Sequence, residues 1–474
     1  MKVLLINPKI KAWSPNIYPP LGLAYIAAAL EDVRHFVKIL DMNSRKVSDE
    51  ELMMKVANAD IVGITGLVTE YNEVVRLSKY IRGINHFVRL VLGGPLVTTH
   101  TQKVMLASKA DYAVIGEGEK TVVELLEAVR CGGDVSNVKG IAYKAHDDTV
   151  VINPMRDPIA DLDTISFPAR HLLDMTRYTT HHFKSFGLKL PYKVKSTTLC
   201  SSRGCPYECS YCYKEVWGHK WRGRSPENII GEMKLLKSQY DFNGFVFNDD
   251  TFVVDRKRAM DFCRQLIDSD LNVKWYCNGR INLMDRELLG AMALSGCVGI
   301  AYGIESGNQR ILDSIKKGIT LEQIERVVKE TKEVGIHITG YFMLGILGDT
   351  KETIQQTLDF ARKLDLNFYG FTMTSPIEGT PMHTEAMKQG LMPYQELEDW
   401  SFRSSVNLTV DCTREDLEKF NDMAFREFTI QKRYGKNYLF NPKLWVDGAK
   451  SVAFLAGKRD YRELINKSWS VIRK

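Results

Sequence analysis

The most informative segment of the chain is Cys205-Pro-Tyr-Glu-Cys209-Ser-Tyr-Cys212, in which three cysteines follow the spacing C-x3-C-x2-C. Thiolates this close in sequence can bind three irons of a 4Fe–4S cube and leave the fourth iron open to an outside ligand. A structural zinc ion normally takes four protein ligands, and Cys200 is near enough in sequence to be the fourth. The spacing alone therefore leaves an open iron–sulfur cluster and a zinc site as alternatives.

The composition is that of an ordinary globular protein. The chain has 474 residues, 44% apolar and 26% charged, which is long enough for two domains and a tail. Its net charge of +6 is small for this length and does not argue for nucleic-acid binding. The cysteines outside the motif lie mostly in apolar segments, as expected of reduced thiols in a cytoplasmic protein. No stretch approaches the roughly 20 apolar residues of a membrane span.

Residues 1–130 alternate short apolar runs with helical patterns, which is typical of a doubly wound parallel sheet. Strands are predicted at Val3–Asn7, Phe36–Asp41, Asp60–Thr65, Val88–Leu92 and Asp111–Ile115. Helices are expected to begin near Pro20, Ser48, Glu70 and Thr101, and a last helix is expected from Glu119 to about Val129. In such a sheet ligands bind outside the carboxyl ends of the strands, so the polar and glycine-rich turns should share one rim.

Residues 131–194 are predicted to be a connector with a β-hairpin, formed by Gly140–Lys144 and Thr149–Asn153. Strands alternate with helices again over residues 195–385. The predicted strands are Lys195–Leu199, Gly244–Phe247, Val273–Cys277, Val298–Ile304, His337–Met343 and Asn367–Met373. Six such units fit an open (β/α)6 barrel, because a full eightfold barrel usually needs about 250 residues. Residues 386–474 are expected to form a helical tail that caps the barrel, with helical spacing at Tyr394–Trp400, Arg414–Tyr434 and Tyr461–Ile472.

The cysteine motif resembles the cluster loop of the radical S-adenosylmethionine (SAM) enzymes, and the first 130 residues resemble the cobalamin-binding domain that precedes many of them. The resemblance covers nearly the whole chain up to residue 385. Besides the cysteines, the phrases that carry it are Pro19–Leu30, Gly116–Glu119, Asp161–Ala169, Met343–Thr350 and Ser375–Pro381. It implies a 4Fe–4S cluster held by Cys205, Cys209 and Cys212, together with SAM and cobalamin.

Polar residues follow the barrel strands where this family binds SAM. A carboxylate or amide after the second strand can accept hydrogen bonds from the SAM ammonium, and a guanidinium after the third can grip its carboxylate. A carboxylate after the fourth strand matches the position at which the family contacts the ribose. The candidate SAM-binding residues are Tyr211, Asn248, Asp249, Arg280, Gly303, Glu305 and Ser306.

The resemblance also implies which rim residues bind cobalamin. They are Asn7, Asp41, Leu67, Val68, Thr69, Gly93, Gly94, Gly116, Glu117 and Gly118. The cobalamin motif D-x-H-x-x-G would place a histidine two positions after Asp41, but this chain has Asn43 there. If cobalamin binds, that histidine is not its lower ligand, and the loop Leu67–Glu70 is expected to approach the lower face of the corrin.

We interpret the sequence as that of a cobalamin-dependent radical SAM enzyme that methylates an unactivated carbon. In the resembled family one SAM methylates cob(I)alamin, a second yields the 5′-deoxyadenosyl radical, and the substrate radical takes the methyl group. The same layout also serves cyclisation, ring contraction, oxidation or dehydration, and it can lack bound cobalamin. A second hypothesis is a non-catalytic corrinoid or iron–sulfur carrier. The expected partners are a small-molecule, lipid or protein side-chain substrate and an electron donor such as flavodoxin or ferredoxin.

Overall fold

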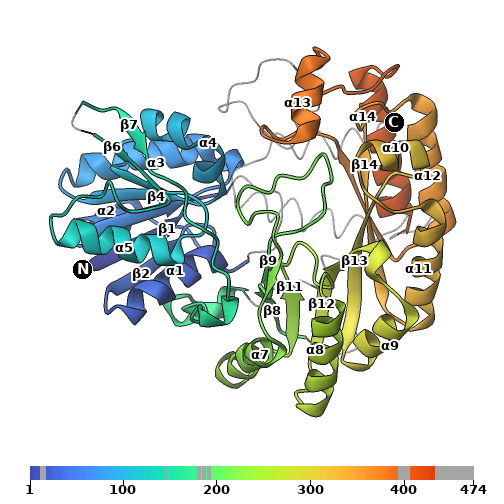
Figure 1. Cartoon of the computed structure of the whole chain (residues 1–474), viewed down its shortest axis with the longest axis horizontal. Coiled ribbons are helices and arrows are strands. Elements are labelled where there is room, and N and C mark those ends of the chain that lie inside the picture. Colours follow the sequence, from blue (N-terminus) through green and yellow to red (C-terminus); the bar gives the residue numbers. More distant parts are fainter. Residues whose placement is uncertain are drawn as a thin grey trace.

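The computed structural model describes residues 1–10, 18–145, 147–178, 183, 188, 194–392 and 406–432. Figure 1 shows two α/β units beside each other, each built on its own sheet. The first unit, blue to teal, lies on the left, and the second, green to orange, lies on the right. The green loops that follow strand β8 (Ser196–Leu199) lie between the two units.

The first sheet has seven strands in the order β2-β1-β3-β4-β5-β6-β7. Strands β1 to β5 are parallel, which confirms the predicted doubly wound sheet, whereas β6 and β7 are antiparallel. The strands are β1 (Lys2–Asn7), β2 (Phe36–Asp41), β3 (Ile61–Thr65), β4 (Arg89–Gly93), β5 (Tyr112–Val114), β6 (Ile141–Lys144) and β7 (Val150–Ile152). The predicted hairpin is therefore confirmed, and it extends the first sheet past residue 130 because β6 pairs with β5.

Helices alternate with the parallel strands of the first unit. They are α1 (Leu21–Asp32), α2 (Asp49–Ala57), the short η1 (Val68–Glu70), α3 (Tyr71–Ile84), α4 (Pro95–Ala107) and α5 (Glu119–Arg130). The predicted starts agree with these bounds except at α4, where Thr101 was wrong. Helix α4 begins six residues earlier because Gly94 turns the chain at φ +87° and Pro95 supplies a helical φ at the first position. Its geometry is interrupted at His100 (φ −134°, ψ 41°), next to the predicted start.

The second sheet has six parallel strands in the order β15-β14-β13-β12-β11-β8. This arrangement confirms the predicted open barrel of six βα units. Its further strands are β11 (Gly244–Phe247), β12 (Lys274–Gly279), β13 (Cys297–Glu305), β14 (His337–Leu344) and β15 (Phe368–Met373). Buried aromatic rings pack behind the sheet, with Phe247 and Phe262 each within 6 Å of the Trp275 ring, at 5.8 and 5.5 Å.

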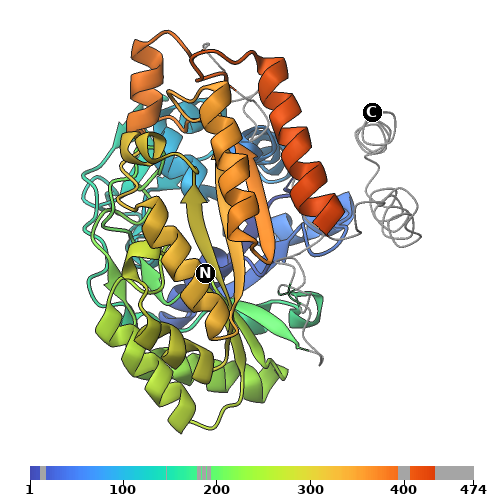
Figure 2. The ribbon, with the colours of Figure 1, turned by 90° about the vertical axis from the view of Figure 1, so that its right-hand side faces the viewer.

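Helices cover the outer face of the second sheet, which Figure 2 views from the side opposite the first unit. They are α7 (Pro226–Tyr240), α8 (Arg256–Asp268), η5 (Ile281–Leu283), α9 (Arg286–Leu294), α10 (Gln309–Ser314), α11 (Leu321–Glu333) and α12 (Lys351–Leu364). Helix α13 (Pro381–Lys388) lies apart from them, at the top of the second unit in Figure 1. Ser225 caps the start of α7, with Pro226 at the first helical position, and Thr320 forms a capping box with Gln323 at the start of α11; both are helix-start signals in the sequence. Because the helices occupy the outer face, the carboxyl ends of the strands are left to carry polar loops.

Two short strands form a separate ribbon between the main sheets. Strand β9 (Ser202–Arg203) pairs antiparallel with β10 (Arg222–Gly223), and the segment between them contains all three motif cysteines. We call residues 204–221 the cluster loop. The connector before the barrel adds three short helices, η2 (Leu162–Thr164), η3 (Arg170–Leu172) and η4 (Met175–Tyr178).

The tail is described in part. Helix α14 (Arg414–Ala424) continues as the π-helical segment η7 (Phe425–Gln431), which agrees with the helix predicted from Arg414. The other two predicted tail helices, at Tyr394–Trp400 and Tyr461–Ile472, lie outside the described residues. Among the helices that are described, none has the length and hydropathy that a membrane span requires.

A buried ion network joins the connector to the barrel. The Glu232 carboxylate on α7 is inaccessible to solvent and contacts Arg170 at 2.5 Å and Arg224 on its other oxygen. Arg170 also donates to the carbonyl oxygen of Thr198 in β8, at 3.0 Å. Burial opposes ionisation of Glu232, but the two arginines outweigh it and hold the pKa of the carboxyl below its usual value.

We expect Glu232→Gln to lower the free energy of unfolding by about 3 kcal/mol, because it leaves two buried guanidiniums without a neutralising charge. Urea unfolding followed by circular dichroism measures the loss in the barrel transition. Glu322→Gln, which changes an exposed carboxylate in the first turn of α11, is the matched control and should change stability by less than about 0.5 kcal/mol. Equal midpoints for the two variants would show that the network does not stabilise the barrel.

Candidate functional site

The cluster loop is anchored to the rest of the barrel at several points. The backbone N–H of Cys205 donates to Gly218 O at 3.4 Å, near the two ends of the loop. In the middle, Ser210 N–H donates to Ile315 O at 3.0 Å, and Ser210 O accepts from Met382 N–H at 2.9 Å. The loop therefore presents its cysteines from a fixed position beside the end of the barrel.

The three motif thiols lie within electrostatic reach of one another. Desolvation by the surrounding protein and the negative charges of Asp250, Cys205 and Cys209 raise the pKa of the Cys212 thiol to about 11. Three thiolates can be present together only beside a strongly positive centre, which fits an iron–sulfur cluster. In the described chain, no three His, Cys, Asp or Glu side chains converge on a point that would hold a single ion. The thiol positions by themselves do not separate the cluster from the zinc alternative.

Arg280, which follows β12, lies against the cluster loop. It is 8% exposed, and its Nη1 donates to Cys209 Sγ at 3.6 Å. Its guanidinium carbon lies 3.7 Å from the centre of the Tyr207 ring, and Nη2 donates to the carbonyl oxygen of Lys317. The structure therefore places this predicted SAM-binding residue directly beside a cluster cysteine.

Glu305 ends β13 at the centre of a buried polar group. Its Oε1 accepts from Lys317 Nζ at 2.6 Å and from Tyr211 OH at 2.8 Å, and Lys317 Nζ also contacts Tyr211 OH at 2.9 Å. The register shifts between Gly303 and Glu305, and Glu305 has φ +66°, a rare conformation for a residue with a side chain. A Cβ at Gly303 would lie 2.3 Å from Glu305 Oε1, so only glycine permits this group.

This Glu305 group brings together three predicted SAM residues and one that the sequence did not indicate. Burial and the Glu305 charge both raise the pKa of Tyr211, so its hydroxyl stays protonated and donates to the carboxylate. Lys317 was missed because the Lys-Lys-Gly sequence at 316–318 is typical of an exposed helix end. Nothing in that pattern indicates that the second lysine turns inward.

The two adjacent carboxylates after β11 have different environments. Asp249 is buried and accepts from Ser201 N–H at 2.7 Å, from Ser201 Oγ at 2.5 Å and from Ser202 Oγ at 2.7 Å. Asp250 is exposed, and its carboxylate accepts no hydrogen bond from any residue that the structure describes. Desolvation and the neighbouring Asp249 charge raise the pKa of Asp250. The geometry therefore favours Asp250 over the predicted Asp249 as the carboxylate that meets a ligand.

The remaining predicted SAM residues lie nearby. The Asn248 side chain is exposed, while its backbone N–H donates to Leu199 O at 2.8 Å and continues the pairing of β11 with β8. Ser306 is buried, and its Oγ contacts Thr357 Oγ1 at 3.1 Å and accepts from Asn308 N–H at 3.1 Å. The Ser306 hydroxyl is thus used within the barrel, which indicates a structural role.

On the first unit, the carboxyl ends of β1 and β2 are joined by Asp41. Its Oδ1 accepts from Asn7 Nδ2 at 2.9 Å and from Asn43 N–H at 3.0 Å, and its Oδ2 accepts from Tyr178 OH at 2.7 Å. Asn43 uses its own side chain to hold two backbone groups, Ile10 N–H at 2.6 Å and Pro8 O at 2.7 Å. The residue in the histidine position is therefore a loop anchor, consistent with the prediction that no histidine binds cobalt from there.

The loop Leu67–Thr69 projects from the same rim. Leu67 is 42% exposed, and the buried Glu70 carboxylate holds the loop by accepting from Leu67 N–H at 2.6 Å and from Thr69 Oγ1. Of the predicted glycines, Gly93 ends the strand β4, where it pairs with Thr65, and Gly94 follows it. This part of the rim presents backbone and an apolar tip, which suits the flat face of a corrin.

The Gly116–Glu119 turn has a different arrangement from the predicted one. Gly116 N–H donates to Thr98 Oγ1 at 3.0 Å, and Gly118 packs against α1. The Glu117 carboxylate is buried and paired with Arg222 at 2.6 Å, an arginine of the second unit. The geometry therefore favours an interdomain role for Glu117 over direct contact with a corrin. The sequence did not assign Arg203 or Arg222, although both flank the cysteine motif.

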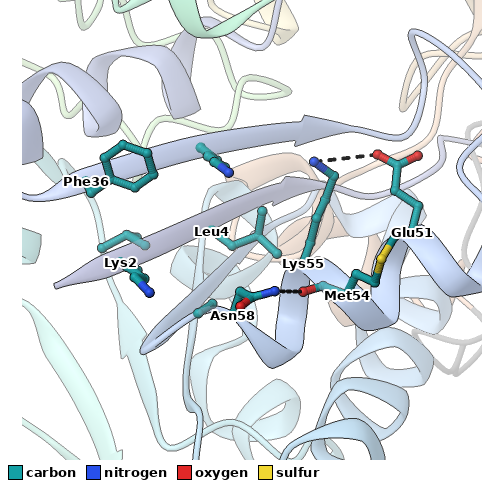
Figure 3. Close-up of a pocket in the computed structure, with 10 residues that line it drawn as sticks. Lys2, Leu4, Phe36, Glu51, Met54, Lys55 and Asn58 are labelled. Atoms are coloured by element: carbon teal, nitrogen blue, oxygen red, sulfur yellow. Dashed lines mark hydrogen bonds and ion pairs between the residues drawn. The ribbon is translucent and has the colours of Figure 1, made fainter.

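A pocket of about 350 Å³ lies at the opposite rim of the first sheet (Figure 3). Lys2 and Phe36, at the amino ends of β1 and β2, line it together with Met54, Lys55 and Asn58 of the α2 region. None of the predicted site residues lines it. Because ligands of open α/β sheets bind at the carboxyl ends, this pocket is separate from the candidate site.

Two family models match the chain. Residues 9–126 match the B12 binding domain, and residues 199–361 match the radical SAM superfamily. An uncharacterized methyltransferase of Pyrococcus horikoshii is 33% identical over 441 residues, covering 91% of this chain and 93% of the relative. An anaerobic magnesium-protoporphyrin IX monomethyl ester cyclase of Rubrivivax gelatinosus is 30% identical over 388 residues, covering 79% of this chain and 68% of the relative. A cytidylyl-2-hydroxyethylphosphonate methyltransferase of Streptomyces wedmorensis is 29% identical over 501 residues, covering 92% of this chain and 93% of the relative.

Solved structures share the fold. The cobalamin-dependent SAM radical enzyme OxsB with aqua-cobalamin bound matches with a TM-score of 0.75 at 15% identity, covering 96% of this chain and 72% of that one. The radical SAM methyltransferase TsrM from Kitasatospora setae, with cobalamin and a 4Fe–4S cluster bound, matches with a TM-score of 0.68 at 22% identity, covering 82% and 75%. This chain belongs to the radical SAM enzymes that carry a cobalamin-binding domain, and its cofactors are a 4Fe–4S cluster, SAM and cobalamin.

Proposed function

We propose that this enzyme transfers a methyl group to an unactivated carbon of its substrate. The observation that carries the proposal is the extent of the similarity. Two relatives named as methyltransferases are covered over 93% of their own length, and each covers more than 90% of this chain. By contrast, this chain covers 68%, 64% and 64% of three relatives named as cyclases. The similarity to these two methyltransferases thus extends over nearly their whole length, whereas the similarity to the three cyclases covers about two thirds of theirs.

A second candidate function is radical cyclisation without methyl transfer. It is supported by the 30% identity to the Rubrivivax gelatinosus cyclase, which is close to the identity to either methyltransferase. The carrier hypothesis has no comparable support, because the matched radical SAM domain and the buried Glu305 group suit an enzyme that binds SAM.

When bound, the cluster and SAM supply abstraction of a hydrogen atom, and cobalamin supplies the methyl group. Cys205, Cys209 and Cys212 provide the three thiolates of the cluster, and Arg280 places a positive charge beside Cys209. A hydrogen-bond donor on a thiolate stabilises its negative charge. The protein thus holds the cluster at the end of the barrel and compensates part of its charge.

The Glu305 group orients SAM in this proposal. Glu305 is paired with Lys317 in a buried position, and its carboxylate oxygens can accept hydrogen bonds from ribose hydroxyls. Asp250 is the carboxylate that remains free for the SAM ammonium. On the first unit, the Leu67–Thr69 loop supports the lower face of the corrin without a histidine ligand.

The remaining partners are proposed from the family. An external one-electron donor such as flavodoxin or ferredoxin reduces the cluster. The substrate is a small molecule, a lipid or a protein side chain; TsrM, which shares the fold, has been solved with tryptophan as its substrate. The cysteine usage and the need for a reduced cluster place the enzyme in a reducing cytoplasm in this proposal.

The test of methyl transfer uses anaerobically reconstituted protein, hydroxocobalamin, a chemical reductant and SAM labelled in its methyl group. A methylase transfers the label to the protein-bound corrinoid and also forms 5′-deoxyadenosine. A cyclase forms 5′-deoxyadenosine and leaves the corrinoid unlabelled, and that result would contradict the proposal. Cys209→Ala is the control for the radical step, since it should abolish 5′-deoxyadenosine formation.

Replacing any one motif cysteine with alanine should reduce bound iron from about four atoms per chain to less than half, because two thiolates do not retain a cube. Iron analysis and the absorption spectrum after reconstitution measure the loss. Cys131→Ala, at an exposed cysteine outside the motif, should leave the iron content unchanged. Full iron content in all three motif variants would exclude these cysteines as the cluster ligands.

Glu305→Gln should raise the dissociation constant for SAM by roughly tenfold, about 1.4 kcal/mol, because the amide neither binds hydroxyls as strongly nor neutralises Lys317. Equilibrium dialysis with the reconstituted enzyme measures the affinity. Ser306→Ala is the matched control, since the Ser306 hydroxyl is engaged with Thr357 and should not contribute to SAM binding. An unchanged affinity in Glu305→Gln, or a comparable loss in Ser306→Ala, would contradict these roles.

A further inference from the structure

Four buried charges lie where the cluster loop meets the first unit. Arg203 Nη2 contacts Glu119 Oε1 at 2.5 Å, and Arg222 Nη2 contacts Glu117 Oε1 at 2.6 Å. Arg203 Nη1 also lies 3.6 Å from Glu117 Oε2. The four side chains are between 4% and 9% exposed, so the group is closed to solvent. We call these four residues the interdomain clasp.

The clasp joins elements that are far apart in the sequence. Both arginines belong to the two-stranded ribbon, where Arg203 in β9 pairs in register with Arg222 in β10. The ribbon closes the cluster loop, and Arg203 is two residues before Cys205. Glu117 belongs to the turn between β5 and α5, and Glu119 is the first residue of α5, so both lie at the carboxyl-end rim of the first sheet. The clasp therefore connects the base of the cluster loop to the rim that binds cobalamin.

Additional contacts restrain both arginines. The Arg203 guanidinium lies 4.7 Å from the Trp217 ring and 5.4 Å from the Tyr25 ring of α1. Arg222 donates through Nη1 to Ile159 O at 2.6 Å, and Glu117 Oε2 accepts from Ile159 N–H at 2.8 Å. The connector residue Ile159 thus bridges one arginine and one glutamate, so the clasp includes all three parts of the chain.

Charge balance makes this contact sensitive to the relative position of the units. Two guanidiniums and two carboxylates neutralise one another, whereas separation by a few ångströms would leave them buried and unpaired. Removing one partner of a buried ion pair destabilises a protein far more than removing one partner of an exposed pair. A contact of this kind permits one arrangement of the two units and penalises the others.

We propose that the interdomain clasp positions the 4Fe–4S cluster relative to the cobalamin, so that both cofactors face one substrate at a constant separation. Its four members are positioning residues, since none needs to touch a cofactor. The proposal rests on the cofactors of the family and does not depend on whether the reaction is a methyl transfer. Reaction geometry is demanding on this scale, because a displacement of about 1 Å can slow a reaction on the order of a hundredfold.

The test is the distance between the two metal centres, measured by electron paramagnetic resonance in the reconstituted enzyme. Reduced cluster and cobalt(II) are both paramagnetic, so their dipolar coupling reports the separation without any turnover. In Glu119→Gln the mean distance should shift by about 1 Å or more and its distribution should widen, because Arg203 loses its closest charge partner. Glu124→Gln is the matched control, since Glu124 lies on the same helix but pairs with Arg156 within the first unit and its connector.

An unchanged distance and width in a Glu119→Gln protein that carries full iron and cobalt would overturn the proposal. If Glu119→Gln does not retain its cofactors, Arg203→Lys takes its place, because lysine keeps the charge but cannot make the forked contact with both glutamates. A wild-type distance in Arg203→Lys would then overturn the proposal in the same way. Failure of methyl transfer in the labelling test leaves this measurement unaffected, so the two proposals fail separately.

Discussion

Buried charge that must be neutralised across element boundaries is the constraint on which the rest of this structure depends. A lone guanidinium or carboxylate away from water is costly, so each buried member fixes the position of its partner. Glu232 joins the connector to the barrel in this way, and Glu119 joins the first unit to the base of the cluster loop. These buried pairs hold the connector against the barrel and the first unit against the base of the cluster loop.

The buried group around Glu305, on the predicted SAM side of the site, also depends on neutralising a buried charge. A left-handed φ at Glu305 is unfavourable by itself, yet it directs the carboxylate to Lys317 and Tyr211. Gly303 leaves the space in which that group forms. Strain in one residue is therefore offset by a buried ion pair and two hydrogen bonds, and the result is a fixed carboxylate at the end of a barrel strand.

Much of the fold could be predicted from local pattern. The strands of both sheets, the capping box at Thr320 and the hairpin before the barrel follow from short-range periodicity and turn chemistry. The start of α4 was predicted six residues too late, although the Gly94-Pro95 pair is a helix-start signal in the sequence. The sequence motif correctly indicated that Glu305 lies at the end of a strand. The site was not predictable where two adjacent residues of one type differ only in environment, as at Asp249 and Asp250.

The sequence by itself determined the residue types and their order: three thiolates in one loop, glycines and carboxylates after parallel strands, and an asparagine where a cobalt-binding histidine would stand. These follow from spacing along the chain, which is local information. Only the tertiary structure decided the partner of each charge. Glu117 faces Arg222 across the domain boundary, and Lys317 turns inward to Glu305. Such pairings depend on which distant segments share a buried volume, and that is a property of the packed molecule.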